Sequence, residues 1–303
     1  MAHQDVLDAA NATPALPAIR TIGPADLKDA LTKGLDDFRA MPTHAVFISL
    51  LYPLVGLILG GLSLGYDIVP LLFPLAAGFA LLGPFAAIGL YEFSRRREQG
   101  LDTSWQHAFD VVHSPSFGGI VALGLLLVAI FLVWLATAHA IYIAYFGYGP
   151  PPAPAAFLHQ ILTTRNGWGL IIVGNGVGFL FAVVAFTLSA ISFPMLLDRN
   201  VTAAMAALTS LRVVIENPVT MALWGLIVAI ALAIGSIPFL LGLAVVMPVL
   251  GHATWRLYRK AIERDPAHEV AVELPRSEAF VESPLLRPVW IFLDCLEAMR
   301  RKI

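Results

Sequence analysis

The side chains that could bind a metal form one loose group. His107, Asp110 and His113 follow one another at intervals of three residues, and Glu92 precedes them in the chain. On a helix this spacing brings imidazole and carboxylate groups toward one face, as a metal site requires. Solvated polar residues on an amphipathic helix produce the same pattern. Because ligation also needs convergent geometry and supporting contacts, the sequence predicts no metal site here.

Two further histidines, His139 and His252, fall within apolar stretches. A buried pair of histidines could ligate a haem. We expect His139 near the outer end of one membrane helix and His252 near the inner end of another. One haem cannot bridge opposite depths, so we expect a satisfied or interfacial histidine at each position and no bound cofactor.

Enzyme chemistry has little support in the sequence. An enzyme acting on lipid would need Glu92, Asp198 and His107 to converge. The chain has no Gly-rich loop leading to Lys-Ser or Lys-Thr, no His-Glu-x-x-His and no nucleophile elbow. Residues 174–178 (Gly-Asn-Gly-Val-Gly) superficially resemble a dinucleotide-binding loop, but they follow no strand. We therefore expect a non-enzyme without catalytic, cofactor-binding or metal-binding residues.

Composition indicates the elements that carry these residues. Hydrophobic residues make up 58% of the 303 residues and charged residues 13%, against about a quarter charged in a typical soluble domain. Windows without Asp, Glu, Lys or Arg occupy 40–66, 68–91, 111–164, 166–197 and 217–255. About 20 apolar residues in a helix cross a bilayer, so these windows indicate membrane spans. The net charge of -2 excludes a basic nucleic-acid binder, and the lipid bilayer is the expected partner.

The predicted fold is all-α, because these runs lack the alternation of barrel strands. Six transmembrane helices are predicted at about 43–64, 68–91, 118–145, 168–197, 219–234 and 239–255. The last window would make a helix of roughly 58 Å, about twice a bilayer core, so we place a turn at 235–238. Residues 147–167 contain a proline cluster at 150–154 that cannot continue a helix, and they are predicted as a linker.

Amphipathic stretches precede the first, third and fifth spans, at 23–42, 102–115 and 200–218, and each ends at a proline. We therefore predict three pseudo-repeats of interfacial helix plus helical hairpin over 23–265. A disordered N-terminal tail (1–22) precedes them, and a cytoplasmic tail (266–303) ending in an amphipathic helix follows. The interfacial helices either steer the hairpins into the bundle or form a docking platform for a soluble partner.

The faces of two of these helices can be drawn from the spacing of their apolar residues. In the first, the apolar stripe is predicted at Leu27, Leu31, Leu35 and Phe38, with Asp26, Lys28, Asp29, Lys33, Asp36 and Asp37 off that face. In the third, Asn200 is predicted as the cap of a stripe formed by Val201, Ala204, Met205, Leu208, Leu211 and Ile215.

Basic residues set the predicted orientation. With both termini cytoplasmic, 18 of the 19 Lys and Arg residues fall on the inner side and only Arg165 falls outside. No ionisable residue lies at mid-span, where holding a charge costs several kcal/mol. Ion-coupled transport is therefore disfavoured, whereas a passive pore is not.

Residues 192–199 (Ser-Phe-Pro-Met-Leu-Leu-Asp-Arg) and 211–225 carry a family resemblance. Over roughly 19–265 the chain resembles a family of predicted bacterial integral membrane proteins known only as a domain of unknown function. Relatives are sometimes labelled cytochrome c oxidase subunit I, but His139 and His252 are too few to bind two haems and copper. The resemblance implies the bacterial inner membrane and no particular activity.

Two functional hypotheses follow. The first is a non-enzymatic accessory, assembly or scaffold protein of a membrane complex, with a membrane-protein partner or a second copy of itself. The alternative is a passive channel or permease for a small solute, lined by Asn175, Thr187, Ser189 and Ser192. Gly174 and Gly178 suit close helix packing, and Asn175 is expected to form a cross-helix hydrogen bond.

Overall fold

A computed structural model describes residues 17–42, 54, 58, 61, 69–81, 83–104, 107, 110–112, 114–149, 151–238 and 240–263. These residues belong to one compact unit that ends at Glu263. Within the described ranges the chain is helical, and its only extended pairing is an isolated bridge between Ile19 and Ile262. Nearly all of the predicted first span, His113 and the predicted tail helix lie outside the described residues.

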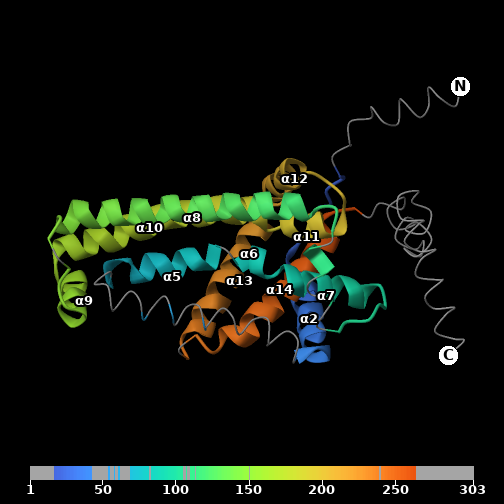
Figure 1. Ribbon diagram of the computed structural model, residues 1–303, viewed down its shortest axis with the longest axis horizontal. Coiled ribbons are helices and arrows are strands. Elements are labelled where there is room, and N and C mark those ends of the chain that lie inside the picture. The colour runs from blue at the N-terminus through green and yellow to red at the C-terminus, as the bar shows by residue number, and fades with distance from the viewer. Residues whose placement is uncertain are drawn as a thin grey trace, which may run out of the picture. The chain divides into compact units, whose positions relative to one another are not determined.

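Long apolar helices form at the predicted third, fourth and fifth spans. They are α8 (Phe117–Phe146), α10 (Arg165–Ser189) continued by α11 (Ser192–Asp198), and α13 (Pro218–Ser236). All three are long and apolar enough to cross a membrane. Helices α8 and α10 lie side by side along their length (Figure 1). At 1.5 Å per residue α8 is about 45 Å long, enough to cross a bilayer core.

The second predicted span is broken into pieces. Its region forms η1 (Val69–Leu71), α5 (Leu72–Leu81), α6 (Gly83–Ala86) and α7 (Ile88–Glu98). Pro84 lies within α6, where it cannot donate a backbone hydrogen bond, and Ala87 separates α6 from α7. The sixth predicted span corresponds to α14 (Leu243–Ala261), which contains Pro248 and ends in charged residues. Three candidate spans are therefore present among the described residues, and six remains a prediction.

The predicted linker at 147–167 contains a helix that the sequence analysis missed. Helix α9 spans Pro154–Thr163 and begins at a proline, the residue best suited to the first helical position. Phe157 is buried and packs against the rings of Tyr142 and Phe146, with centroids 6.0 and 5.9 Å away. Helix α8 thus ends just before Gly147, which has a positive φ of 79°, and Pro154 begins α9.

The first interfacial helix forms as α2 (Pro24–Ala40), and its buried face shares Leu27 with the predicted stripe, while Leu31 and Phe38 of that stripe are partly buried against the core. Leu27, Ala30, Gly34 and Asp37 are the buried residues, and α2 packs against α14. A Cβ at Gly34 would lie 2.6 Å from the backbone nitrogen of Ala253. The small face allows the two backbones to approach closely, and this packing carries Asp37 inward, contrary to the prediction.

The third interfacial helix forms as α12 (Ala203–Glu216), and its predicted cap is wrong. Thr202, not Asn200, precedes the helix, and its hydroxyl accepts the backbone N–H of Met205 at 3.2 Å. Helix α12 buries a mainly small and polar face made of Ala206, Thr209, Ser210 and Val213. Helices α2 and α12 therefore pack differently, and the pseudo-repeat remains a prediction.

The predicted N-terminal tail enters the fold before residue 23. The backbone N–H of Arg20 donates to the Ala261 carbonyl at 2.8 Å, and that of Glu263 donates to the Ala18 carbonyl at 3.0 Å. Ile22 donates its N–H to Oδ1 of the buried Asn217 at 2.8 Å. This N-terminal segment, residues 18–22, ties the end of α14 to the start of α13.

Candidate functional site

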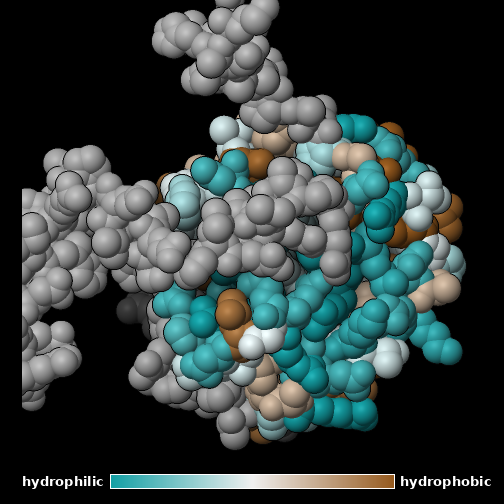
Figure 2. Space-filling view, turned by 90° about the vertical axis from the view of Figure 1, so that its right-hand side faces the viewer, coloured by the Kyte–Doolittle hydropathy of each residue, from teal (hydrophilic) through white to brown (hydrophobic). Residues whose placement is uncertain are grey.

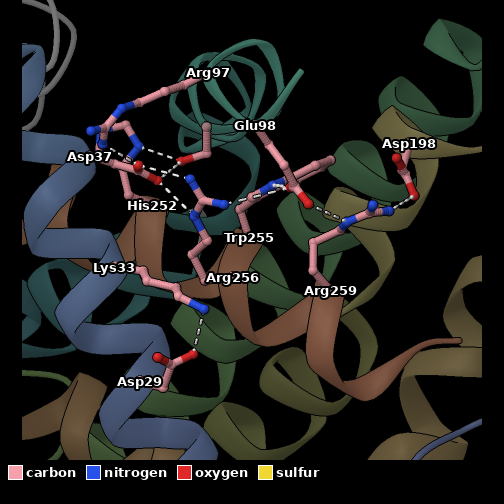
Figure 3. A network of polar contacts seen from close by, with 11 residues as sticks. Asp29, Lys33, Asp37, Arg97, Glu98, Asp198, His252, Trp255, Arg256 and Arg259 are labelled. Carbon is pink, nitrogen blue, oxygen red and sulfur yellow. Dashed lines mark hydrogen bonds and ion pairs between the residues drawn. The ribbon is translucent and has the colours of Figure 1, made fainter. Parts of the chain in front are cut away.

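The polar residues of the described structure gather where α2, α7, α11 and α14 meet (Figure 3). Helix α14 supplies three cations of this junction, because Arg256, Arg259 and Lys260 follow its apolar stretch. Carboxylates from the other three helices face them. Figure 2 looks onto this end of the molecule and shows hydrophilic residues over most of its described surface. We call the interacting polar residues at this meeting point the polar junction. They are Asp26, Asp29, Lys33, Asp37, Ser94, Arg97, Glu98, Asp198, His252, Trp255, Arg256, Tyr258, Arg259 and Lys260.

Asp37 is the centre of the polar junction and is 1% exposed. Arg256 donates to both of its carboxylate oxygens, through Nε and Nη2 at 2.9 Å each. Arg97 from α7 donates to Oδ1, and the Ser94 hydroxyl lies 2.9 Å from Oδ2. Bidentate, charge-assisted bonds of this kind are the strong ones in proteins. Asp37 therefore links three helices.

The hydrogen-bond pattern assigns the tautomer of the fully buried His252. Its Nδ1 lies 2.8 Å from Ser94 Oγ, which has a single hydrogen and directs it to the anionic Asp37. A carboxylate only accepts, so His252 Nδ1 donates to Ser94. Its other ring nitrogen, Nε2, is also buried. The order Asp–Ser–His is not that of a catalytic triad, in which histidine stands between the other two.

A second part of the polar junction is built around Arg259. Its Nε donates to Glu98 at 3.2 Å and its Nη1 to Asp198 at 3.2 Å. The Tyr258 hydroxyl donates to Asp198 at 2.6 Å, and the Trp255 indole donates to Glu98 at 3.0 Å. Burial, together with the Asp198 carboxylate, raises the pKa of Tyr258 well above its ordinary value. The phenol therefore acts as a fixed hydrogen-bond donor.

The outer edge of the polar junction joins α2 to α14 through Lys260. Its ammonium lies 3.1 Å from Asp26 and 2.9 Å from Asp29, which also pairs with Lys33 at 2.9 Å. The backbone N–H of Gly23 and the Lys260 ammonium lower the pKa of Asp26. Exposed pairs contribute little individually, and these extend the contact between the two helices.

The residues that a lipid-active enzyme would need do not converge on one point. Glu92, 1% exposed, accepts from Nε and Nη2 of Arg95 at 2.8 Å each. Arg96 lies 3.7 Å from Glu92 and 3.3 Å from Asp110, which contacts His107 at 2.6 Å. Asp198 instead belongs to the Arg259 group. The ionised groups are thus neutralised in separate sets.

Only some of the predicted metal ligands lie among the described residues. His107 contacts Asp110 and also Asp102 at 3.2 Å, while His113 lies outside the described residues. His139 is exposed on α8, far along the chain from the buried His252 of α14. Within the described ranges, no three His, Cys, Asp or Glu side chains are arranged to hold a metal ion.

The mid-span polar residues differ from the predicted pore lining. Asn175 is exposed and donates to the Ile171 carbonyl of its own helix at 2.8 Å, not across helices as expected. Ser189 and Ser192 are buried and bond to backbone carbonyls, Ser192 also reaching Ala206 on α12. A hollow of about 450 Å³ lies between α5, α8 and α10. Of the four predicted lining residues only Asn175 borders it, beside Phe73, Trp134, Phe179 and Phe181.

The burial of Asp37 was not predicted, because residue spacing placed Asp37 on the solvated face of its helix. A signal was present: Leu27, Ala30, Gly34 and Asp37 recur at intervals of three and four, and the small residues among them permit close packing. Ser94 and Arg97 share one face of α7 by the same spacing. Both contact Asp37, which lies 57 and 60 positions earlier in the chain, and Asp37 contacts Arg256, which lies 219 positions after it, so spacing alone could not pair them.

Three long apolar helices that meet a polar, charge-paired junction define an integral membrane protein. Residues 72–198 match the family described as "Predicted integral membrane protein (DUF2189)". This is the family of unknown function to which the sequence resemblance pointed, and the match covers the region from α5 to α11. No curated protein and no solved structure matches the chain.

Proposed function

We propose that this chain is a non-enzymatic scaffold or accessory protein of a membrane complex in the bacterial inner membrane. The observation that carries the proposal is the polar junction. Its carboxylates and cations neutralise one another and cross-link four helices, as Asp37 does with Ser94, Arg97 and Arg256. Such pairing fixes a rigid surface and holds its ionised groups away from chemistry on a substrate.

The proposed topology has six spans with both termini in the cytoplasm. The clustering of Arg95, Arg96, Arg97, Arg256, Arg259 and Lys260 at one end of the described structure supports it. Arg165 begins α10 and is separated from that end by the length of the helix. Cytoplasmic segments are rich in Lys and Arg, so the polar junction faces the cytoplasm.

Cysteine labelling of intact cells tests this orientation. On a Cys295→Ser background, which has no other cysteine, Tyr148→Cys places a thiol at a residue that is 90% exposed beyond α8. A membrane-impermeant maleimide should modify it in intact cells. Arg39→Cys, on the exposed surface of α2, serves as the matched control and should react only after permeabilisation. The reverse pattern contradicts the proposed topology.

Site-specific photo-crosslinking tests the scaffold role. A photoreactive amino acid at Lys28 or Arg39, exposed on α2, should yield one adduct of defined mass in native membranes. The same group at Leu226, exposed on α13, is the control and should yield only lipid adducts. Absence of a protein adduct at both α2 positions would contradict the scaffold.

The alternative, a passive channel or permease, predicts solute flux through protein-containing liposomes. Asn175 at the hollow between α5, α8 and α10 is the observation that favours it. Asn175→Leu should then reduce the flux, while Thr137→Val, on the neighbouring α8 and outside that lining, should not. The burial of Ser189 and Ser192 supports the scaffold over the channel.

A further inference from the structure

Helix α12 turns its large apolar side chains outward. Leu208 is 53% exposed, Leu211 37% and Ile215 64%. These residues recur at intervals of three and four, so they form one stripe along the helix. An exposed apolar stripe on a membrane protein requires either lipid or a partner to cover it.

The opposite face of α12 is fixed to the protein, so the stripe cannot turn inward. Ser210 Oγ accepts the backbone N–H of Ile191 at 3.2 Å, and Ser192 Oγ lies 3.1 Å from the Ala206 carbonyl. Ala206, Thr209, Ser210 and Val213 are all fully buried. These contacts join α12 to the end of α10 and to α11, which sets the direction in which Leu208 and Ile215 point.

Helix α12 leads directly into a candidate membrane-spanning helix. Only Asn217, which is not helical, separates α12 from α13. Helix α13 has the length and hydropathy of a membrane span, and it exposes apolar residues of its own, namely Val219, Leu223, Leu226, Ile230 and Ile234. One end of the α12 stripe therefore adjoins a surface suited to lipid.

The direction of α12 and its polar flank also suit the membrane boundary. In Figure 1 α12 is seen nearly end-on while α8 and α10 run across the picture, so α12 lies across the direction of these two apolar helices. Arg212 pairs with Glu216 at 3.0 Å on the side of the stripe. Helices that lie in the plane of the interface combine an apolar face with charged residues at its edge.

We propose that α12 is an in-plane membrane helix whose stripe, Leu208, Leu211 and Ile215, inserts among the lipids at the boundary of the hydrocarbon core. The direct connection to α13 favours lipid over a soluble protein, because the stripe ends at Ile215, immediately before the start of a candidate membrane span at Pro218. Helix α12 thereby fixes the depth of the bundle. The inference depends on membrane insertion alone and is independent of the scaffold role.

Liposomes that contain only this protein and lipid provide the test. On the Cys295→Ser background, the full-length chain carries Leu208→Cys or Ile215→Cys, labelled with an environment-sensitive fluorophore. Glu216→Cys is the matched control, because it adjoins Ile215 but lies on the charged flank. Ile230→Cys on α13 marks the membrane interior. Nitroxide lipids quench at shallow or deep positions, and iodide quenches from water.

Fluorophores at 208 and 215 should be quenched several-fold more strongly by shallow nitroxides than by deep ones or by iodide. The fluorophore at 230 should respond to the deep nitroxides, and the one at 216 to iodide. Stronger quenching by iodide than by lipid at 208 and 215 would overturn the proposal. If a label at 208 or 215 prevents folding, the unlabelled cysteines replace it. In the same liposomes, the cysteines at 208 and 215 should react with an impermeant maleimide several-fold more slowly than the cysteine of Glu216→Cys. Equal reaction rates would overturn the proposal.

Discussion

Replacing Asp37 by Asn removes the one carboxylate that joins α2, α7 and α14. Asn keeps the size of the side chain but loses its charge. The N–H groups of its amide then lie opposite the N–H donors of Arg256 and Arg97, with which they cannot form hydrogen bonds. The guanidinium of Arg256 then has no anion in its bidentate position. Removing one partner of a buried ion pair is strongly destabilising, because the remaining charge is left uncompensated.

The loss of stability depends on how well water solvates Arg256 and Arg97 once the Asp37 carboxylate is gone. Asp37 has a side-chain exposure of 2%, while Arg256 and Arg97 are exposed to 17% and 38%. A fully buried pair costs about 3–5 kcal/mol when one partner is removed. Because water partly solvates both arginines here, we expect Asp37→Asn to lower the free energy of unfolding by about 3 kcal/mol.

Unfolding by SDS in mixed micelles, followed by tryptophan fluorescence, measures this change. Trp224 and Trp255 are both 1% exposed, so their emission reports the loss of the core. Asp36→Asn is the control. Asp36 pairs with Arg39 at 3.8 Å with both side chains more than half exposed, and its loss should cost at most about 0.5 kcal/mol. Equal effects of Asp37→Asn and Asp36→Asn would refute the central role of Asp37.

Three further variants test other contacts by the same unfolding assay. Gly34→Val places atoms against the Ala253 backbone and should cost at least about 1–3 kcal/mol; an unchanged midpoint would contradict the close packing of α2 on α14. Asn217→Leu leaves buried backbone groups of the N-terminal segment unpaired and should cost about 1–3 kcal/mol, with faster proteolysis near residue 20. Asp26→Asn tests pH dependence: the Gly23 N–H lowers the folded-state pKa below the ordinary value of 3.8. Asp26 therefore contributes stability that is complete above pH 3.8 and is lost as the pH falls through the folded-state pKa, so wild type and variant should differ at pH 7 and converge in stronger acid.

Helix positions were the most predictable feature of the fold. The predicted third and fifth spans match α8 and α13 to within two residues at each end, and the predicted fourth span corresponds to α10 and α11 together. The turn placed at 235–238 overlaps the end of α13 at Ser236. Length and hydropathy are properties of a contiguous segment, so they can be read directly from the sequence. Helix α9 was not predicted, because the prolines at 150–154 were interpreted only as helix breakers, whereas a proline also suits the first position of a helix, as Pro154 does.

Helix faces were predicted less well. The stripes of large apolar residues on α2 and α12 were recognised, and Leu27 of the first is buried, but the faces that pack onto the protein also contain small residues that were not predicted there, such as Gly34 and Ala206. In a soluble protein the largest apolar stripe marks the core. In a membrane protein lipid is as apolar as a core, so small residues that permit close approach mark the packed face.

The sequence by itself determined that this is a helical membrane protein and which segments are apolar enough to enter lipid. Only the tertiary structure decided that Asp37, Ser94 and Arg256 form a buried set, and that Glu92 and Asp198 are neutralised by different arginines. The physical reason is the range of each interaction. Hydropathy acts on each segment separately, whereas an ion pair depends on a distance of a few ångströms between residues that lie far apart in the chain, 234 positions in the case of Asp26 and Lys260.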